Sequence, residues 1–165
     1  MRGVHYKNMD TIAAISTANG IGGIGVIRIS GENAVEIADK VFVSFDGVSQ
    51  LSSLKGYRAK YGKVIKDGKF IDEAIALVFK APHSYTGEDV VEISCHGGLY
   101  ITRQVLRTVL DAGASLAGAG EFTKRAFLNG KVDLSQAEAV MDIIAAKSEH
   151  ANAIAFNQKE GTTSK

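Results

Sequence analysis

The sequence has little of what marks several large protein classes. Its 165 residues include one cysteine, one proline and no tryptophan. A single cysteine cannot form an intramolecular disulfide, which excludes a disulfide framework and fits a reducing compartment. No apolar run reaches the roughly 18–20 residues of a membrane span, and no signal-peptide core precedes the first strand pattern. These absences predict a cytoplasmic protein with no membrane partner.

An excess of charge of either sign is also missing. The formal net charge is +1, while 22% of residues are charged and 45% are hydrophobic. Such a composition is typical of a globular chain that can bury a core. Contact with nucleic acid would therefore have to come from a local basic patch, because the global charge gives no case for it.

Short β-branched runs and amphipathic segments alternate through the first two thirds of the chain. Strands are expected at 11–17, 24–30, 57–65, 73–79, 89–95 and 114–118, with a hairpin turn at Asp67-Gly68. A helix with Ser30 as N-cap follows the second strand and carries Ala34, Val35, Ala38, Val41 and Phe42 as its apolar stripe. A polar connector covers 44–56, and a second helix covers 98–113 and ends at Gly113. This order predicts an α+β fold, a mostly antiparallel sheet with helices packed on one face.

The pattern changes near Gly118. A short helix is expected at 120–130, then a long one over 132–158 that begins with a capping box of Ser135 and Glu138. Its apolar stripe needs other helices to cover it; the stripe is Ala137, Val140 or Met141, Ile144, Ser148, Ala151 and Ala155. We therefore expect an N-terminal extension at 1–8, one domain at 9–118, and the truncated beginning of a helical domain at 119–165.

The glycines between the first two strands are not a nucleotide site by themselves. Gly20, Gly22, Gly23 and Gly25 lie in a loop that a strand follows, whereas a dinucleotide fingerprint needs a helix there. A Walker A loop occurs nowhere in the chain, since "NGKV" has Val132 where Ser or Thr is required. A tight turn that needs positive φ is the simpler interpretation.

Two charged residues lie inside apolar strands, where each is expected to have a partner of opposite charge or a ligand. Arg28 shares a face with Ile24 and Val26, and Glu92 shares one with Val90, Ser94 and His96. A carboxylate fixed on a strand can accept two parallel N–H bonds from a planar donor, such as a guanidinium or a pterin edge. The residues leave both a bound ligand and an internal Arg28–Glu92 bridge open.

Other reactive side chains have ordinary explanations. Cys95 and His96 are neighbours on a strand, so they point to opposite faces and make a poor catalytic dyad. Cys95 is expected in the core, and His96, ahead of Gly97-Gly98, is expected to bind an anion or cap the turn. The four histidines have no metal-ligand spacing, so neither a metal nor a catalytic residue is predicted. Lys131, with Lys124 and Arg125, forms a small basic cluster that suits a polyanion or plain solvent.

Three strings carry a specific resemblance: "GIGVIRISG", "PHSYTGEDVVEISCHGG" and "GEFTKRAFLNGKVDLSQAEAVMDII". Together they resemble the N-terminal part of the tRNA modification GTPase family (MnmE, also called TrmE), from Met9 to about Gln158. The resemblance implies a tetrahydrofolate-binding, dimer-forming domain similar to the glycine-cleavage aminomethyltransferase, followed by the first long helix of a helical domain.

Further implications concern chemistry. Family proteins carry a GTPase module, with GTP, magnesium and potassium, that this chain lacks. With a flavoprotein partner they add a carboxymethylaminomethyl-type group to C5 of the wobble uridine of tRNA. The one-carbon unit comes from 5-formyltetrahydrofolate or 5,10-methylenetetrahydrofolate.

By motif, the resemblance implies Arg28, Glu92 and Lys131 as the folate contacts, and Glu92 is then expected to lack a protein counter-ion. The sequence departs from the family at Gly118-Ala119, where Arg-Pro is usual, which loosens the loop before the basic helix. Two other functions stay open: a stand-alone folate-dependent aminomethyltransferase-like enzyme, and a dimerisation fragment with a decayed folate site.

Overall fold

The structure is a computed structural model that describes residues 9–17, 22–47 and 50–163, with side chains described up to residue 150. The chain divides into two compact units, Met1–Ala117 and Gly118–Lys165. Several expectations lie outside the described residues: the extension at 1–8, Gly20 in the glycine-rich loop, and the side chains of Ala151 and Ala155.

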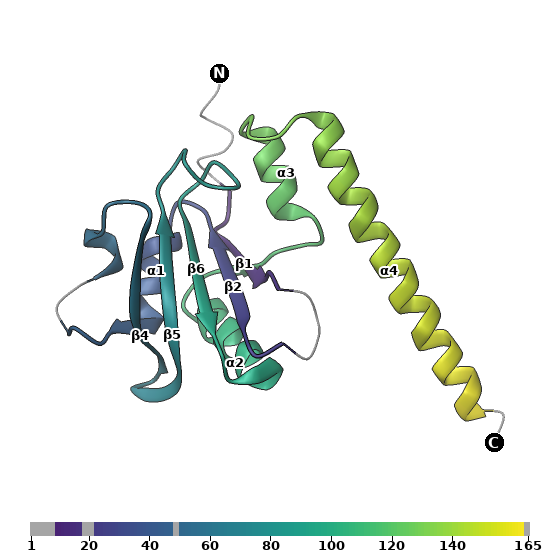
Figure 1. Cartoon of the computed structure of the whole chain (residues 1–165), viewed down its shortest axis with the longest axis horizontal. Coiled ribbons are helices and arrows are strands. Elements are labelled where there is room, and N and C mark those ends of the chain that lie inside the picture. Colours follow the sequence, from purple (N-terminus) through teal and green to yellow (C-terminus); the bar gives the residue numbers. More distant parts are fainter. Residues whose placement is uncertain (1–8, 18–21, 48–49, 164–165) are drawn as a thin grey trace. The chain divides into compact units, whose positions relative to one another are not determined.

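A seven-stranded sheet forms the first unit within the described residues (Figure 1). Its strands are β1 (Ile12–Ile15), β2 (Gly25–Ser30), β3 (Phe42–Ser44), β4 (Arg58–Lys66), β5 (Lys69–Phe79), β6 (Val90–Cys95) and β7 (Ser115–Leu116). The strand order is β3-β4-β5-β6-β2-β1-β7, and the pairs are antiparallel except for β1 with β7. The α+β fold with a mostly antiparallel sheet is thereby confirmed.

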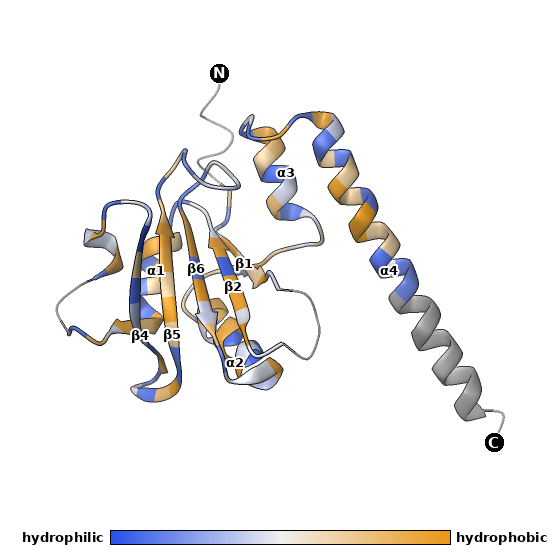
Figure 2. Cartoon of the chain, in the orientation of Figure 1, coloured by the Kyte–Doolittle hydropathy of each residue, from blue (hydrophilic) through white to orange (hydrophobic). Residues whose placement is uncertain are grey.

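Helices α1 (Ala34–Val41) and α2 (Gly98–Asp111) pack against the same face of this sheet, behind the strands in Figure 1. Alternation along the strands explains why that face is covered. Ile27 and Ile29 of β2 and Val91 and Ile93 of β6 are fully buried in the core beneath the helices. Figure 2 shows the resulting apolar content of the central strands. The residues between them in sequence, Arg28 and Glu92 included, face the other way.

Two boundaries in the first helical segment differ from the sequence expectation. The N-cap position of α1 is Asn33, not Ser30, which is the last residue of β2. Phe42 is the first residue of β3 instead of the end of the helical stripe. Strand β3 therefore begins where the end of the helix was expected. A short 3₁₀ turn (Leu51–Ser53) lies within the expected polar connector. β3 spans three residues, which is too short to show a period of two.

The turns follow their predicted chemistry. Asp67 and Gly68 have φ of +51° and +78°, as a two-residue hairpin with both central residues in the left-handed region requires. Helix α2 closes with Ala112 as C-cap and Gly113 next, so the predicted stop at Gly113 is confirmed. This hairpin places the ends of β4 and β5 side by side.

The second unit contains α3 (Glu121–Leu128) and α4 (Leu134–Thr163). The expected capping box of Ser135 and Glu138 is wrong by two residues. Asp133 Oδ1 accepts the N–H of Gln136 at 2.8 Å, and Gln136 Oε1 accepts the N–H of Asp133 at 3.0 Å. This reciprocal pair is the capping box; Ser135 lies inside the helix. No helix of the described chain combines the length and the apolarity needed to cross a membrane.

Candidate functional site

The sheet face opposite α1 and α2 carries the candidate site. The backbone register aligns Ala14, Arg28, Glu92, Leu77 and Ala59 in one row across β1, β2, β6, β5 and β4. Residues directly paired across strands project to the same side of a sheet. The row therefore sets one guanidinium and one carboxylate side by side, between small or aliphatic neighbours.

Arg28 and Glu92 are in direct contact. Arg28 Nη2 donates to Glu92 Oε2 at 3.4 Å, and each side chain is 23% exposed. The expectation that Glu92 lacks a protein counter-ion is therefore wrong, because the antiparallel register makes these two residues neighbours. The contact is nevertheless long and uses one atom from each group, unlike a bidentate pair. Its partial exposure leaves the pair within reach of a ligand.

Tyr85 adds a ring beside the pair, and sequence reasoning missed it. The guanidinium of Arg28 lies 5.0 Å from the centre of the Tyr85 ring, within the range of a cation–π interaction. The loop that carries Tyr85 is fixed by Thr86, which is fully buried and 2.7 Å from the hydroxyl of Ser30. The sequence signal for Tyr85 was the stretch "SYTGED" directly before β6. A polar loop that leads into a core strand has to lie against the sheet, and its ring can then reach the sheet face.

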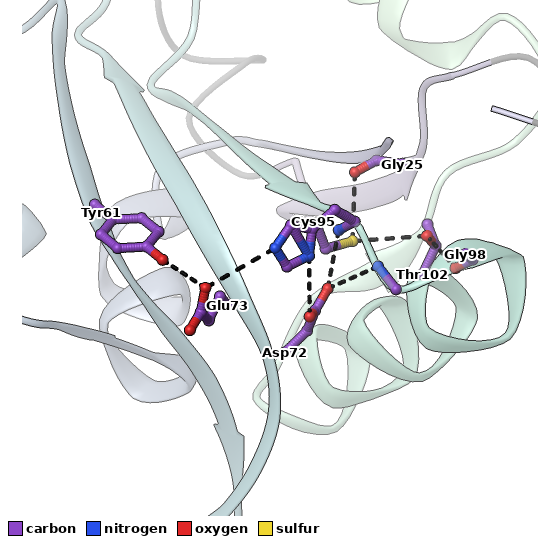
Figure 3. Close-up of polar contacts among 9 residues, drawn as sticks. Gly25, Tyr61, Asp72, Glu73, Cys95, Gly98 and Thr102 are labelled. Atoms are coloured by element: carbon purple, nitrogen blue, oxygen red, sulfur yellow. Dashed lines mark hydrogen bonds and ion pairs between the residues drawn. The ribbon is translucent and has the colours of Figure 1, made fainter. Parts of the chain in front are cut away.

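A second polar group lies where β6 ends (Figure 3). Asp72 of β5 is buried, and its Oδ2 accepts the N–H groups of His96 and Gly97 at 2.9 and 3.0 Å. Its other oxygen is 3.2 Å from Nδ1 of His96, whose side chain is 56% exposed. Asp72 thus satisfies the turn before α2, a role that the sequence assigned to His96.

Two further residues extend this group across the open face. His96 Nε2 lies 4.0 Å from a carboxylate oxygen of Glu73, and Glu73 accepts the hydroxyl of Tyr61. That hydrogen bond raises the pKa of Tyr61. A cleft of about 120 Å³ lies beside these groups. It is lined by Ile24, Tyr61, Glu73, Ala74, Ile75, Ser94, Cys95 and His96.

Cys95 is a core residue, as predicted. It is 1% exposed, and its thiol donates to the carbonyl of Gly25 at 3.3 Å. Burial raises the pKa of the Cys95 thiol, and the charge of Asp72 adds to the effect. Because the thiolate is the nucleophilic form, this residue is a poor nucleophile.

Gly25 has a packing explanation as well. A Cβ built on Gly25 would lie 2.2 Å from Oγ1 of Thr102 in α2. The missing side chain therefore lets α2 approach β2 closely. Gly25 thus has a packing reason, whereas the positive φ that the turn interpretation predicts is absent at Gly23 and Gly25. Residues 18–21 of the loop lie outside the described chain.

Lys131 belongs to the second unit, and its backbone is fixed by the end of α3. The N–H of Lys131 donates to the carbonyl of Ala126 at 2.8 Å, and that of Gly130 to Phe127 at 3.0 Å. This is a Schellman motif around Gly130, whose φ is +72°. The Lys131 side chain is exposed, so its ammonium group is accessible to an anion.

Arg125 does not join Lys124 and Lys131 in an exposed basic cluster. Its side chain is 5% exposed and lies 3.2 Å from Glu121, one turn earlier in α3. The sequence suggested a cluster because Lys124 and Arg125 are adjacent, but neighbours on a helix point about 100° apart. Among the described residues, no three His, Cys, Asp or Glu side chains gather closely enough to hold a metal ion.

Comparison with known proteins places these motifs in a family. The family model described as "GTP-binding protein TrmE N-terminus" matches residues 11–131. The tRNA modification GTPase MnmE of Clostridioides difficile (strain 630) is 51% identical over 159 residues, which cover 94% of this chain and 34% of the relative. The same protein of Bacillus licheniformis is 53% identical over 158 residues, with the same coverage. The chain spans about a third of the length of these curated relatives.

Proposed function

The chain belongs to the tRNA modification GTPase family (MnmE, or TrmE), and from that premise we propose that it forms the family's N-terminal tetrahydrofolate-binding, dimer-forming part. The Arg28–Glu92 pair carries the proposal. It is half-buried on the sheet face opposite α1 and α2, beside the ring of Tyr85. The proposed ligand is 5-formyltetrahydrofolate or 5,10-methylenetetrahydrofolate.

Complementary chemistry supports this ligand. A pterin offers adjacent N–H donors along one edge, which suit the two oxygens of a carboxylate. Arg28 contacts one carboxylate oxygen of Glu92 and so helps to orient the group towards the ligand. The glutamate tail of the ligand is anionic and suits a basic side chain, and the exposed Lys131 is the third folate contact that the resemblance implies. No residue of this site is assigned a catalytic step.

The larger activity is proposed for the whole protein. There, with a GTPase module and a flavoprotein partner, the bound one-carbon unit would serve carboxymethylaminomethyl-type modification at C5 of the wobble uridine of tRNA. GTP, magnesium and potassium would act in that module. The proposal includes a cytoplasmic location, which the buried free thiol of Cys95 favours.

Thermal unfolding of the 165-residue chain tests the folate site. Ligand at one hundred times its dissociation constant adds about 2.7 kcal/mol of stability, which raises the melting temperature of a chain of this size by roughly 5–10 °C. Glu92→Gln replaces one acceptor oxygen by an NH₂ donor and should remove most of that rise. Glu36→Gln makes the same charge change at an exposed position of α1 and should retain the rise.

An unchanged melting temperature of the wild-type chain in millimolar 5-formyltetrahydrofolate would contradict the proposal and favour a decayed site. A shift that survives Glu92→Gln would mean that folate binds elsewhere. The alternative of a stand-alone aminomethyltransferase-like enzyme predicts turnover of the folate by the chain alone, which our proposal does not.

A further inference from the structure

A second cleft lies away from the Arg28–Glu92 pair, between the β4–β5 hairpin and α2. Its volume is about 360 Å³. The cleft residues used below are Lys66, Lys69, Phe70 and Arg107. Both elements belong to the first unit, so their relative position is part of one compact body.

The hairpin concentrates positive charge at the mouth of this cleft. Lys66 and Lys69 are directly paired across the two strands, on either side of Asp67-Gly68. Like charges placed directly opposite each other destabilise a sheet. Asp111 of α2 offsets part of that cost, since its carboxylate is 2.9 Å from Nζ of Lys66. A bound anion would offset more of it.

Helix α2 extends the positive charge beyond the hairpin. Arg107 lines the cleft, and Arg103 is exposed one turn earlier on the same side of the helix. The cleft is lined by three basic side chains, Lys66, Lys69 and Arg107, and by one acidic side chain, Asp67. Arg103 and Asp111 of α2 add one charge of each sign nearby, whereas the whole chain has a net charge of +1. This is the local patch that the global charge does not reveal.

An exposed aromatic ring completes the cleft. The side chain of Phe70 is 59% exposed although it lies at the end of an apolar strand. An open phenyl ring beside lysine and arginine is the combination that binds single-stranded nucleic acid, in which cations hold phosphates and the ring stacks on a base. Lysine and arginine side chains alone would keep the hairpin soluble, so solubility does not explain the exposed Phe70 ring.

We propose that this cleft binds single-stranded RNA, with Lys69 and Arg107 holding phosphates and Phe70 stacking on a base. Because the basic side chains come from two elements, the hairpin and α2, they suit a chain of phosphates better than one free nucleotide. The choice of RNA rests on the proposed function of a tRNA-modifying protein. The cleft itself is separate from the folate residues.

Fluorescence anisotropy with the full 165-residue chain and a labelled 12-nucleotide single-stranded RNA tests the proposal. Lys69→Ala and Arg107→Ala should each weaken binding about threefold to tenfold and lower the slope of log K against log salt by about 0.7. Phe70→Leu keeps an apolar side chain but loses the ring, and should weaken binding about tenfold with the slope unchanged. Phe70→Tyr should restore binding.

Lys147→Ala is the matched control, because it removes one exposed positive charge from α4. If the cleft variants bind the RNA as Lys147→Ala does, the inference is overturned. If adenosine or uridine 5′-monophosphate binds as tightly as the RNA, the cleft takes a free nucleotide instead, which overturns the RNA assignment. Circular dichroism on each variant confirms its fold.

The RNA inference and the folate proposal fail separately. Lys69→Ala and Arg107→Ala should retain the folate-induced rise in melting temperature, and Glu92→Gln should retain RNA binding. If a variant loses both RNA binding and the folate-induced rise in melting temperature, it has a folding defect. Its circular dichroism spectrum would show that defect.

Discussion

Arg28 and Glu92 show what a single strand pattern can and cannot predict. Alternation separated each from Ile27 and Ile29 or from Val91 and Ile93, and the structure buries those four residues on the opposite face. Their contact depends on the register between strands 64 residues apart, which no local pattern contains. The same limit hid Asp72, whose partners His96 and Gly97 lie 24 and 25 residues later.

Cys95 gives a prediction at the residue scale. Its pKa is raised by burial, so the folded protein keeps the thiol protonated at a pH where the unfolded chain ionises. The corresponding stability is fully present below the unfolded pKa of about 8.5 and is lost as pH rises towards the folded pKa. The free energy of unfolding should therefore fall as pH rises above about 8.5.

Urea unfolding of the wild type and of Cys95→Ala measures this contribution. The variant loses some packing at all pH values, but its stability should fall less steeply with pH. Tyr61, whose pKa is also raised, is present in both proteins and cancels in the comparison. Parallel pH profiles would show that the Cys95 thiol contributes nothing to the pH dependence.

At the scale of elements, long patterns were easier to predict than element boundaries. The helix at 98–113, the hairpin around Asp67-Gly68 and the strand at 89–95 all formed close to their predicted places. Strand β3 was missed because Phe42 continued the helical stripe of α1, and only pairing with β4 makes it extended. The capping box shifted because Ser135 and Asp133 are both good N-cap residues, and the hydrogen bonds select Asp133.

That selection is testable with two neighbouring variants. Asp133→Ala removes the acceptor for the N–H of Gln136 and should cost about 1 kcal/mol in helix stability. Ser135→Ala changes an exposed residue inside the helix and should stay within about 0.5 kcal/mol of the wild type. Chemical unfolding followed by circular dichroism at 222 nm compares them. A larger loss in Ser135→Ala would favour the capping box that the sequence suggested.

For the whole molecule, the sheet face opposite α1 and α2 matters most. It exposes large apolar side chains beside the small cleft, among them Ile24, Tyr61 and Ile75. Exposed apolar patches of this kind mark interaction surfaces. We therefore propose that two copies of the chain associate through this face, next to the Arg28–Glu92 pair.

Sedimentation velocity tests the dimer. Ile75→Glu places a charge in the centre of the apolar patch and should convert dimer to monomer. Tyr100→Glu changes a more exposed residue on α2, on the other side of the sheet, and should leave the dimer intact. A wild-type chain that sediments as a monomer at 100 µM would contradict the proposal, as would equal effects of the two variants.

The 165 residues should also hydrolyse no GTP by themselves. No G-x-x-x-x-G-K-[ST] sequence occurs in the chain, and such a loop supplies the backbone N–H groups and the lysine that hold the phosphates. Phosphate release from GTP should equal the buffer blank after removal of contaminating nucleotidases. Turnover that follows the chain through a further chromatographic step would contradict this expectation.

The most direct measurement of the central proposal is a crystal structure of the chain with 5-formyltetrahydrofolate. We predict that the pterin lies on the open sheet face, with two of its N–H groups donated to the Glu92 carboxylate and with Arg28 still in contact with Glu92. Two results would contradict the proposal. One is a ligand bound elsewhere on the chain, and the other is a structure at saturating ligand concentration with no ligand beside Glu92.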